Sequence, residues 1–223
     1  MSARDDILAN IRRSLGVSGT DAPRRASVEA RLAAHKRGIA PQRGQGDPAA
    51  RLAMFIEQAQ AVATSIARVS NIADAPSQIA AFLHEHDLPA RVIMGEDARL
   101  RDLPWEEAGV AVSYGRSFGD DLNSVSFAEA GIAETGTLAF VSGAHNPTTL
   151  NFLPDNHIVI LRAIDIAADY EAVWARLRDR FGAGLMPRTV NLVTGPSRSA
   201  DIEQKLLLGA HGPRRLHVAI IEA

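Results

Sequence analysis

The chain has 223 residues, of which 46% are apolar and 22% charged, and it contains no cysteine. This composition is close to that of ordinary globular proteins, so it excludes a wholly disordered chain, a collagen-like repeat and an all-helical coiled coil. The lack of cysteine excludes disulfides, catalytic thiols, thiolate zinc sites and iron–sulfur clusters held by this chain's own thiolates.

The formal net charge of −2 hides an uneven distribution. Residues 1–46 hold nine Lys or Arg against four Asp or Glu, a formal +5, whereas residues 47–223 hold fifteen against twenty-two, a formal −7. Because nucleic-acid binders concentrate basic groups and aromatic rings on a folded face, we expect no nucleic-acid partner. No apolar run approaches the roughly 18 residues of a membrane span, and the opening residues lack a secretion signal, so we expect a soluble, cytoplasmic protein.

Residues 1–46 predict a helix followed by a flexible basic arm. Apolar residues recur at helical spacing from Ile7 to Leu15, and Gly16 ends the pattern. The chain from residue 16 to 48 is rich in Gly, Pro, Ser, Gln and Arg, apart from a helical patch at residues 28–35. The first helix is expected to pack on its own domain, on a symmetry mate or on a partner protein, and the sequence leaves these alternatives open.

Residues 47–223 predict an α/β domain. An apolar stripe from Leu52 to Ile66 predicts one long helix, and further helices are expected at residues 78–85 and 170–181. Short apolar runs predict strands at residues 91–95, 110–114, 137–142, 157–161, 189–195 and 216–221. Because several runs are apolar on successive residues, we expect a sheet covered by helices on both faces, with strands of mixed direction.

Residues 133–137, Ala-Glu-Thr-Gly-Thr, place a carboxylate beside a glycine at the entrance of a predicted strand. Glycine allows the backbone to approach a ligand closely, and the hydroxyls of Thr135 and Thr137 can donate and accept hydrogen bonds. Glu134 is therefore a candidate nucleophile or base. A surface turn followed by strand-forming threonines explains the same pattern.

A second polar segment, residues 193–203, leaves a predicted strand through a Gly-Pro pair and is expected to enter a helix capped by Ser197 or Ser199. Backbone N–H groups at such a turn can bind an anion, and Arg198 can clamp a carboxylate or phosphate. Asp201 in the first helical turn would repel that anion. A capped helix with a salt bridge is therefore an equal alternative.

Two histidines lie in loops of the kind that carry function, His145 after a predicted strand and His211 before the last one. His157 and His217 flank or occupy apolar strands, so we expect them to be packed, hydrogen-bonded structural residues. A metal site would need ligands from distant segments, and the candidates are Glu134, His145, Asp201 and His211. We expect no metal site.

Four motifs occur in order in the body, at residues 129–137, 153–158, 195–203 and 209–213. Their residues and spacing closely resemble the LutC/YkgG, or LUD-domain, family of lactate utilization proteins. The resemblance covers most of residues 50–223, and the opening helix also looks like the usual start of that family. It implies a fold similar to the NagB/RpiA/CoA-transferase superfamily, preceded by an N-terminal helical arm.

The resemblance also implies a subunit of the bacterial machinery that oxidises L-lactate to pyruvate with two iron–sulfur proteins. Because this chain has no thiolates, we expect the clusters on the partner proteins and no cofactor on this chain. We expect the motifs to line one cleft, with Glu134 and His211 as proton-transfer groups. The residues expected to bind a small carboxylate substrate are Thr135, Gly136, Thr137, Gly195, Pro196, Ser197, Arg198, Asp201 and Gly212.

Two other functions stay open. Analogy with the wider superfamily suggests a free-standing acyl- or CoA-transferase that uses Glu134 as a covalent carboxylate. A ligand-sensing or interaction module would bind without turnover. An acyl adduct on Glu134 would favour the transferase, whereas lactate oxidation that requires iron–sulfur partners would favour the subunit.

Overall fold

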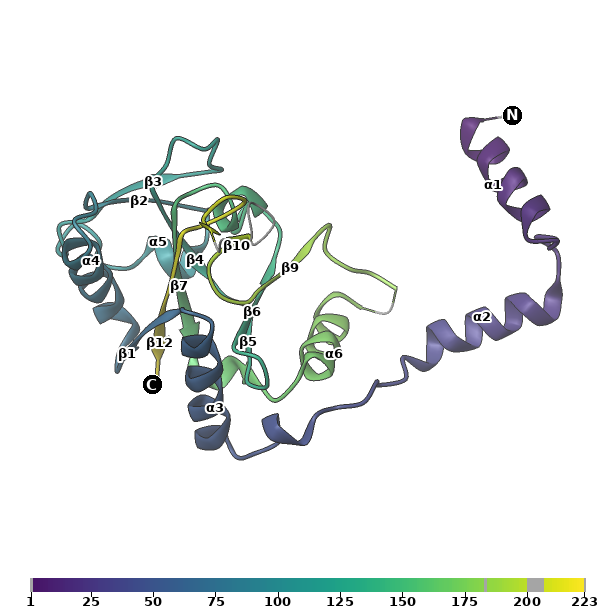
Figure 1. Cartoon of the computed structure of the whole chain (residues 1–223), viewed down its shortest axis with the longest axis horizontal. Helices are drawn as coiled ribbons and strands as arrows, with labels where there is room; N and C mark the ends of the chain where they lie inside the picture. Colours follow the sequence, from purple (N-terminus) through teal and green to yellow (C-terminus); the bar gives the residue numbers. More distant parts are fainter. Residues whose placement is uncertain (1, 183, 200–206, 223) are drawn as a thin grey trace. The chain divides into compact units, whose positions relative to one another are not determined.

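A computed structural model describes residues 2–182, 184–199 and 207–222 of the chain (Figure 1). The chain divides into two compact units, Met1–Ile39 and Ala40–Ala223. Within the described residues, no helix is both long and apolar enough to cross a bilayer.

The N-terminal unit consists of α1 (Ala3–Ser14) and α2 (Ala22–Ala34). Ser2 caps α1 and Asp21 caps α2, each by accepting a hydrogen bond from a backbone N–H of the first turn. The helix expected around residues 7–15 is confirmed. The second helix is longer than the patch predicted at residues 28–35, because its cap lies well upstream in a stretch whose composition suggested a flexible arm.

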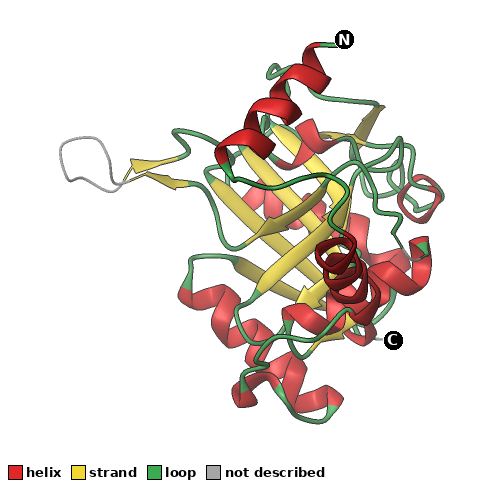
Figure 2. Cartoon of the chain, turned by 90° about the vertical axis from the view of Figure 1, so that its right-hand side faces the viewer, coloured by secondary structure: helices red, strands yellow, loops and turns green. Residues whose placement is uncertain are grey.

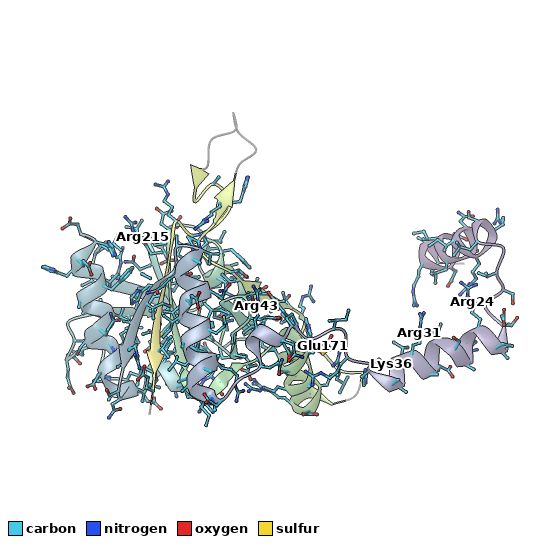
Figure 3. The ribbon with its side chains drawn as sticks, turned by 60° about the horizontal axis from the view of Figure 1, so that its bottom comes forward. Arg24, Arg31, Lys36, Arg43, Glu171 and Arg215 are labelled. Carbon is cyan, nitrogen blue, oxygen red and sulfur yellow. The ribbon has the colours of Figure 1, made fainter. Side chains whose placement is uncertain are left out.

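Neither N-terminal helix buries a residue. The apolar side chains Ile7 and Leu32 are exposed. Basic side chains accompany them, and Figure 3 labels Arg24 and Arg31 on α2 and Lys36 just beyond it. The exposed surface of this unit therefore includes both apolar and basic side chains.

The described part of the body contains two main sheets. The larger is a six-stranded sheet in which every pairing is parallel. Its spatial order is β1 (Ser65–Val69), β12 (Arg215–Ile221), β7 (Asn156–Arg162), β4 (Asn123–Phe127), β2 (Arg91–Met94) and β3 (Ala111–Tyr114). The smaller sheet has the order β8 (Ile166–Ala167), β5 (Ala130–Ile132), β6 (Thr137–Val141) and β9 (Val190–Val193).

The expectation of one mixed sheet is therefore corrected. Mixed direction is confined to the smaller sheet, where β6 runs antiparallel to both β5 and β9 while β8 runs parallel to β5. The sequence placed the runs at 137–142 and 189–195 in the same sheet as the others, because a short buried strand has the same apolar pattern in either sheet.

Helices and short turns complete the body. The α-helices are α3 (Pro48–Ala61), α4 (Ala75–Glu85), α5 (Ala98–Arg101) and α6 (Tyr170–Phe181). The 3-10 turns are η1 (Gln42–Gly44), η2 (Ile72–Asp74), η3 (Thr148–Asn151) and η4 (Ala163–Asp165). A two-stranded ribbon pairs β10 (Arg198–Ser199) with β11 (Leu207–Leu208).

The prediction that the long helix extends to Ile66 is wrong. Helix α3 stops at Ala61, the backbone turns through Ala63 with a φ of 65°, and Ile66 lies in β1 opposite Val218. The apolar spacing of the stripe continues through the turn, so periodicity alone could not locate the break.

Three apolar clusters form the layers of the body, and Figure 2 shows the strands enclosed between helices. In β7, Ile158 and Ile160 join the cluster that includes α4, whereas Val159 and Leu161 join the cluster on the opposite face, with α3 and β6. The third cluster lies between the smaller sheet and α6. Burial of alternate residues on opposite faces explains the unbroken apolar run of this central strand.

Candidate functional site

A chain of polar side chains crosses the amino-terminal edge of the parallel sheet. Arg215, at the start of β12 and labelled in Figure 3, donates from Nη1 to Asn156 Oδ1 at 3.2 Å. Asn156 Nδ2 donates to Asn123 Oδ1 at 2.9 Å, and Asn123 Nδ2 donates to the carbonyl of Pro89 at 3.1 Å. Because parallel strands begin at the same edge of a sheet, these contacts fix the register of β12, β7 and β4 there.

Backbone hydrogen bonds bring three of the sequence motifs together at this edge. The N–H of Ser197 donates to the carbonyl of Pro213 at 2.8 Å, and the N–H of Gly209 donates to the carbonyl of Ser197 at 3.0 Å. The N–H of Arg214 donates to the carbonyl of Asp155 at 2.7 Å. The segments around residues 155, 197 and 211 are therefore neighbours in the fold, although they are far apart in sequence.

These segments enclose a cavity of about 290 Å³, close to the lower end of the range for small-molecule sites. Apolar side chains, including Leu192 and Leu216, form part of its wall. The cavity is lined by six of the residues predicted from the sequence, namely Gly195, Pro196, Ser197, Arg198, His211 and Gly212.

The shape of this cavity depends on Gly195. Its φ is +77°, and an added Cβ would lie 2.6 Å from the carbonyl oxygen of Val62. Only glycine fits such a conformation at such a close approach. The glycine thus lets the chain leave β9 tightly against the end of α3 and turn toward the cavity.

Glu134 lies outside the set of residues that line the cavity. It is 4% exposed, and its Oε1 accepts a hydrogen bond at 3.3 Å from the N–H of Tyr170, the first residue of α6. Its Oε2 has no hydrogen-bond partner among the described residues. The dipole of a helix stabilises a carboxylate at its amino end. The position of Glu134 is therefore explained by a structural contact with α6.

A cluster of hydroxyl groups connects the Glu134 turn with the cavity. Thr137 Oγ1 lies 2.9 Å from Tyr170 Oη and 2.7 Å from both Thr135 Oγ1 and Thr194 Oγ1. Of these residues, Thr194 lines the cavity. Thr135, Gly136 and Thr137 therefore do not line the cavity. The two threonines are connected to it by the hydrogen bond between Thr137 and Thr194. Gly136 fits closely against α3, since an added Cβ would lie 2.3 Å from the backbone nitrogen of Ala59.

Two buried polar side chains that the sequence did not single out as functional also line the cavity. His157 and Asn151 are both 0% exposed. Neither ring nitrogen of His157, nor Nδ2 of Asn151, has a hydrogen-bond partner in the described part of the structure. Burial lowers the pKa of His157 to about 3, so its imidazole is neutral at physiological pH.

The expectation that His157 is a hydrogen-bonded structural residue is therefore wrong about its hydrogen bonds, although the ring is packed 5.3 Å from that of Phe140. The same expectation is confirmed for His217, whose ring nitrogens lie 2.8 Å from Ser65 Oγ and 3.1 Å from Gln78 Oε1. No pattern in the sequence distinguishes these two strand histidines.

The helix predicted to follow a cap at Ser197 is wrong, because Arg198 and Ser199 form strand β10. The alternative helix capped by Ser199 would start at residue 200, outside the described residues. Asp201 lies outside the described residues. His145 is in the loop after β6, where its carbonyl oxygen would be 2.2 Å from a Cβ at Gly95. In the described ranges, no group of three or more His, Asp or Glu side chains is placed to hold a metal ion.

A larger open groove of about 910 Å³ lies beside α5 and β3 and is lined by residues that include Trp105, Glu106 and Tyr114. It contains none of the motif residues. We therefore take the smaller cavity, in which three motifs meet, as the candidate site.

Residues 122–221 match the LUD domain family. Lactate utilization protein C of Geobacillus thermodenitrificans (strain NG80-2) is 31% identical over 144 residues, 60% of either chain. Lactate utilization protein C of Geobacillus sp. (strain WCH70) is 34% identical over 98 residues, 44% of this chain and 41% of that protein. Uncharacterized protein YkgG of Escherichia coli (strain K12) is 35% identical over 99 residues, 44% of this chain and 43% of that protein.

The matches thus span between 41% and 60% of these relatives. The fold is also similar to a crystal structure of a DUF162 family protein from Deinococcus radiodurans, with a TM-score of 0.58 and 24% sequence identity. That similarity covers 79% of this chain and 99% of the other. The resemblance expected from the four motifs is confirmed.

Proposed function

Since the chain carries a LUD domain and is a homologue of proteins named lactate utilization protein C, we propose that it is a component of bacterial L-lactate utilization. In this proposal the cavity binds a small carboxylate, and iron–sulfur partner proteins accept the electrons released when lactate becomes pyruvate. The chain has no cysteine with which to ligate a cluster of its own by thiolates. Electron transfer is therefore assigned to the partners.

The observation that carries the proposal is the polar chemistry of the cavity. Arg198 and His211 come from different motifs and line the same small space as Ser197. A guanidinium can donate two parallel hydrogen bonds to a carboxylate, and a hydroxyl can add a third. The apolar wall near Leu192 and Leu216 suits a short aliphatic substituent such as a methyl group.

The position of Glu134 favours a positioning role over covalent catalysis. Its carboxylate is buried, accepts a hydrogen bond from the N–H of Tyr170 and is not among the groups that line the cavity. A nucleophile must reach the reacting carbon of its substrate, so a substrate in this cavity would be out of its reach. We therefore assign Glu134 to holding the turn against α6, and leave His211 as the proton-transfer candidate.

Calorimetric titration of the full chain with L-lactate tests the carboxylate site. In Arg198→Met, the dissociation constant should rise at least about tenfold, because a charge-assisted hydrogen bond contributes about 1.5–3 kcal/mol. Arg101→Met is the matched control, since Arg101 is an exposed arginine on α5 outside the cavity. Equal affinity in Arg198→Met and the wild type would overturn the carboxylate assignment.

Reconstitution with the iron–sulfur partners tests the wider role. L-lactate should be oxidised at the full rate only when this chain and its partners are all present. An unchanged rate when this chain is left out would contradict its role in the reaction, and turnover by this chain alone would contradict the need for partners.

A further inference from the structure

The candidate cavity has an unusual floor. His157 is the second residue of β7 and Asn151 is the last residue of η3, and both side chains are fully buried where they line the cavity. Together they leave three nitrogen atoms without hydrogen-bond partners in the described structure. Buried polar groups nearly always have hydrogen-bond partners. Three unpaired nitrogen atoms at one cavity therefore indicate that a ligand supplies the missing partners.

The surroundings hold these two side chains in place. Ser126 Oγ donates to Asn151 Oδ1 at 3.3 Å, and Ser124 Oγ donates to the carbonyl of Leu150 at 2.7 Å, which ties η3 to β4. The ring of His157 packs near that of Phe140. The two side chains are therefore held in place, and because each unpaired nitrogen exposes less than 1 Å², neighbouring side chains must shift before a ligand can contact them.

The hydrogen-bonding character of the floor defines the group that fits it. A neutral imidazole offers one N–H donor and one nitrogen acceptor, and the side-chain amide of Asn151 offers a further donor. A hydroxyl group both donates and accepts, and a ketone oxygen accepts from the two donors. A methyl or methylene group would leave all three nitrogen atoms unpaired.

We propose that His157 and Asn151 bind the hydroxyl or ketone oxygen of a short 2-hydroxy or 2-oxo acid, and so select this class over plain carboxylates of the same size. The inference rests on the proposed function for the carboxylate contact at Arg198. It adds the specificity-determining groups, which come from η3 and β7 and are not among the residues that the sequence predicted to bind substrate.

His217 supports this assignment by contrast. It is also a strand histidine with little exposure, but its ring nitrogens face Ser65 and Gln78 and its ring stacks on Phe82, 4.1 Å away. It is not among the residues that line the cavity. A substitution at His217 is therefore a matched control for one at His157.

The test compares L-lactate, pyruvate and propionate as ligands of the full chain by calorimetry. L-lactate and pyruvate should bind at least about tenfold more tightly than propionate, because a site built around hydrogen bonds penalises an analogue that leaves its groups unpaired. In His157→Phe this preference should fall to within about threefold. In His217→Phe the preference should stay as in the wild type.

A second measurement on the wild-type protein avoids any folding defect of the variants. The ring nitrogen resonances of His157, followed by NMR, should shift with L-lactate and with the uncharged probe 1,2-propanediol, but not with propionate. Equal affinity for propionate and lactate, with no shift of the ring, would overturn the inference and leave the carboxylate site standing.

Two further outcomes separate the inference from the proposed function. A ring shift with 1,2-propanediol without binding of any carboxylate would overturn the proposed function and support the hydroxyl-binding floor. Absence of both carboxylate binding and ring shifts would overturn both.

Discussion

The hydroxyl oxygens of Thr137, the first residue of β6, and Thr194, the residue after β9, lie 2.7 Å apart although the two residues are 57 positions apart in sequence. Thr137 directly follows the turn that carries Glu134 and is fully buried, whereas Thr194 lines the cavity. This hydrogen bond explains why the Glu-Thr-Gly-Thr motif accompanies the cavity motifs, although its carboxylate is directed to α6.

A double-mutant cycle measures this connection. Thr137→Val and Thr194→Val should each lower the free energy of unfolding by about 1 kcal/mol, because each leaves a hydroxyl without its partner. The double variant should lose less than the sum of the two, with a coupling of about 0.5–1.5 kcal/mol in urea denaturation. Strict additivity would show that the two hydroxyls do not interact.

Gly195→Ala should disrupt the cavity loop. The backbone has a φ of +77°, and the new Cβ would meet the carbonyl oxygen of Val62 at 2.6 Å. Gly109→Ala is the control, since Gly109 has a φ of +70° and no neighbouring atom within 4 Å of an added Cβ. Gly195→Ala should be destabilising by about 2 kcal/mol more than the control, and equal losses in thermal denaturation would argue against the close approach.

Glu134→Ala should destabilise the protein without changing its ligand affinity. Loss of the acceptor for the N–H of Tyr170 should lower the free energy of unfolding by about 1 kcal/mol, as for other helix-capping groups. Affinity for L-lactate in the folded variant should stay within about threefold of the wild type. Mass spectrometry after incubation of the wild type with acyl-CoA should find no adduct on Glu134, and a stoichiometric adduct there would support the transferase instead.

Buried histidines make the protein sensitive to mild acid. Burial lowers the pKa of His157 to about 3, and burial together with the charge of His86 lowers that of His217 to about 4. Because the unfolded chain binds more protons between these values and about 6.5, each contribution is complete above pH 6.5 and declines as the pH falls toward the folded value.

Between pH 7 and pH 5, each of these histidines should lower the free energy of unfolding by roughly 2 kcal/mol. His217→Gln should therefore lose about 2 kcal/mol less than the wild type over this range in urea denaturation. An identical loss in the two proteins would show that His217 titrates alike in the folded and unfolded states.

The spacing of apolar residues correctly predicted those helices and strands in which one burial pattern continues from end to end. Helix α6 has the predicted bounds of Tyr170–Phe181, and β7 and β12 match their unbroken apolar runs. Strand β4 was missed because two of its five residues are serines, whose burial depends on tertiary contacts with Leu150 and Asn151. A polar residue in a short segment does not reveal such a partner.

The sequence likewise predicted some of the residues that line the candidate site and missed others. The sequence named Arg198 and His211 together, and both line the cavity, because motif residues in loops cluster at the edge of a sheet. It did not identify His157, since a histidine in an apolar strand is indistinguishable from a packed one until its unpaired nitrogens are located in the fold. The separation of Glu134 from the cavity likewise depends on the placement of α6.

The most direct measurement is an NMR titration of the isotope-labelled full chain with L-lactate. The backbone amide signals of residues 194, 195, 197, 198, 211 and 212 should shift together in a saturable way. The amide signals of Trp105, Glu106 and Tyr114, in the larger groove, should stay in place. Shifts confined to the groove, or no saturable shift around the cavity, would contradict the assignment of this cavity as the carboxylate site.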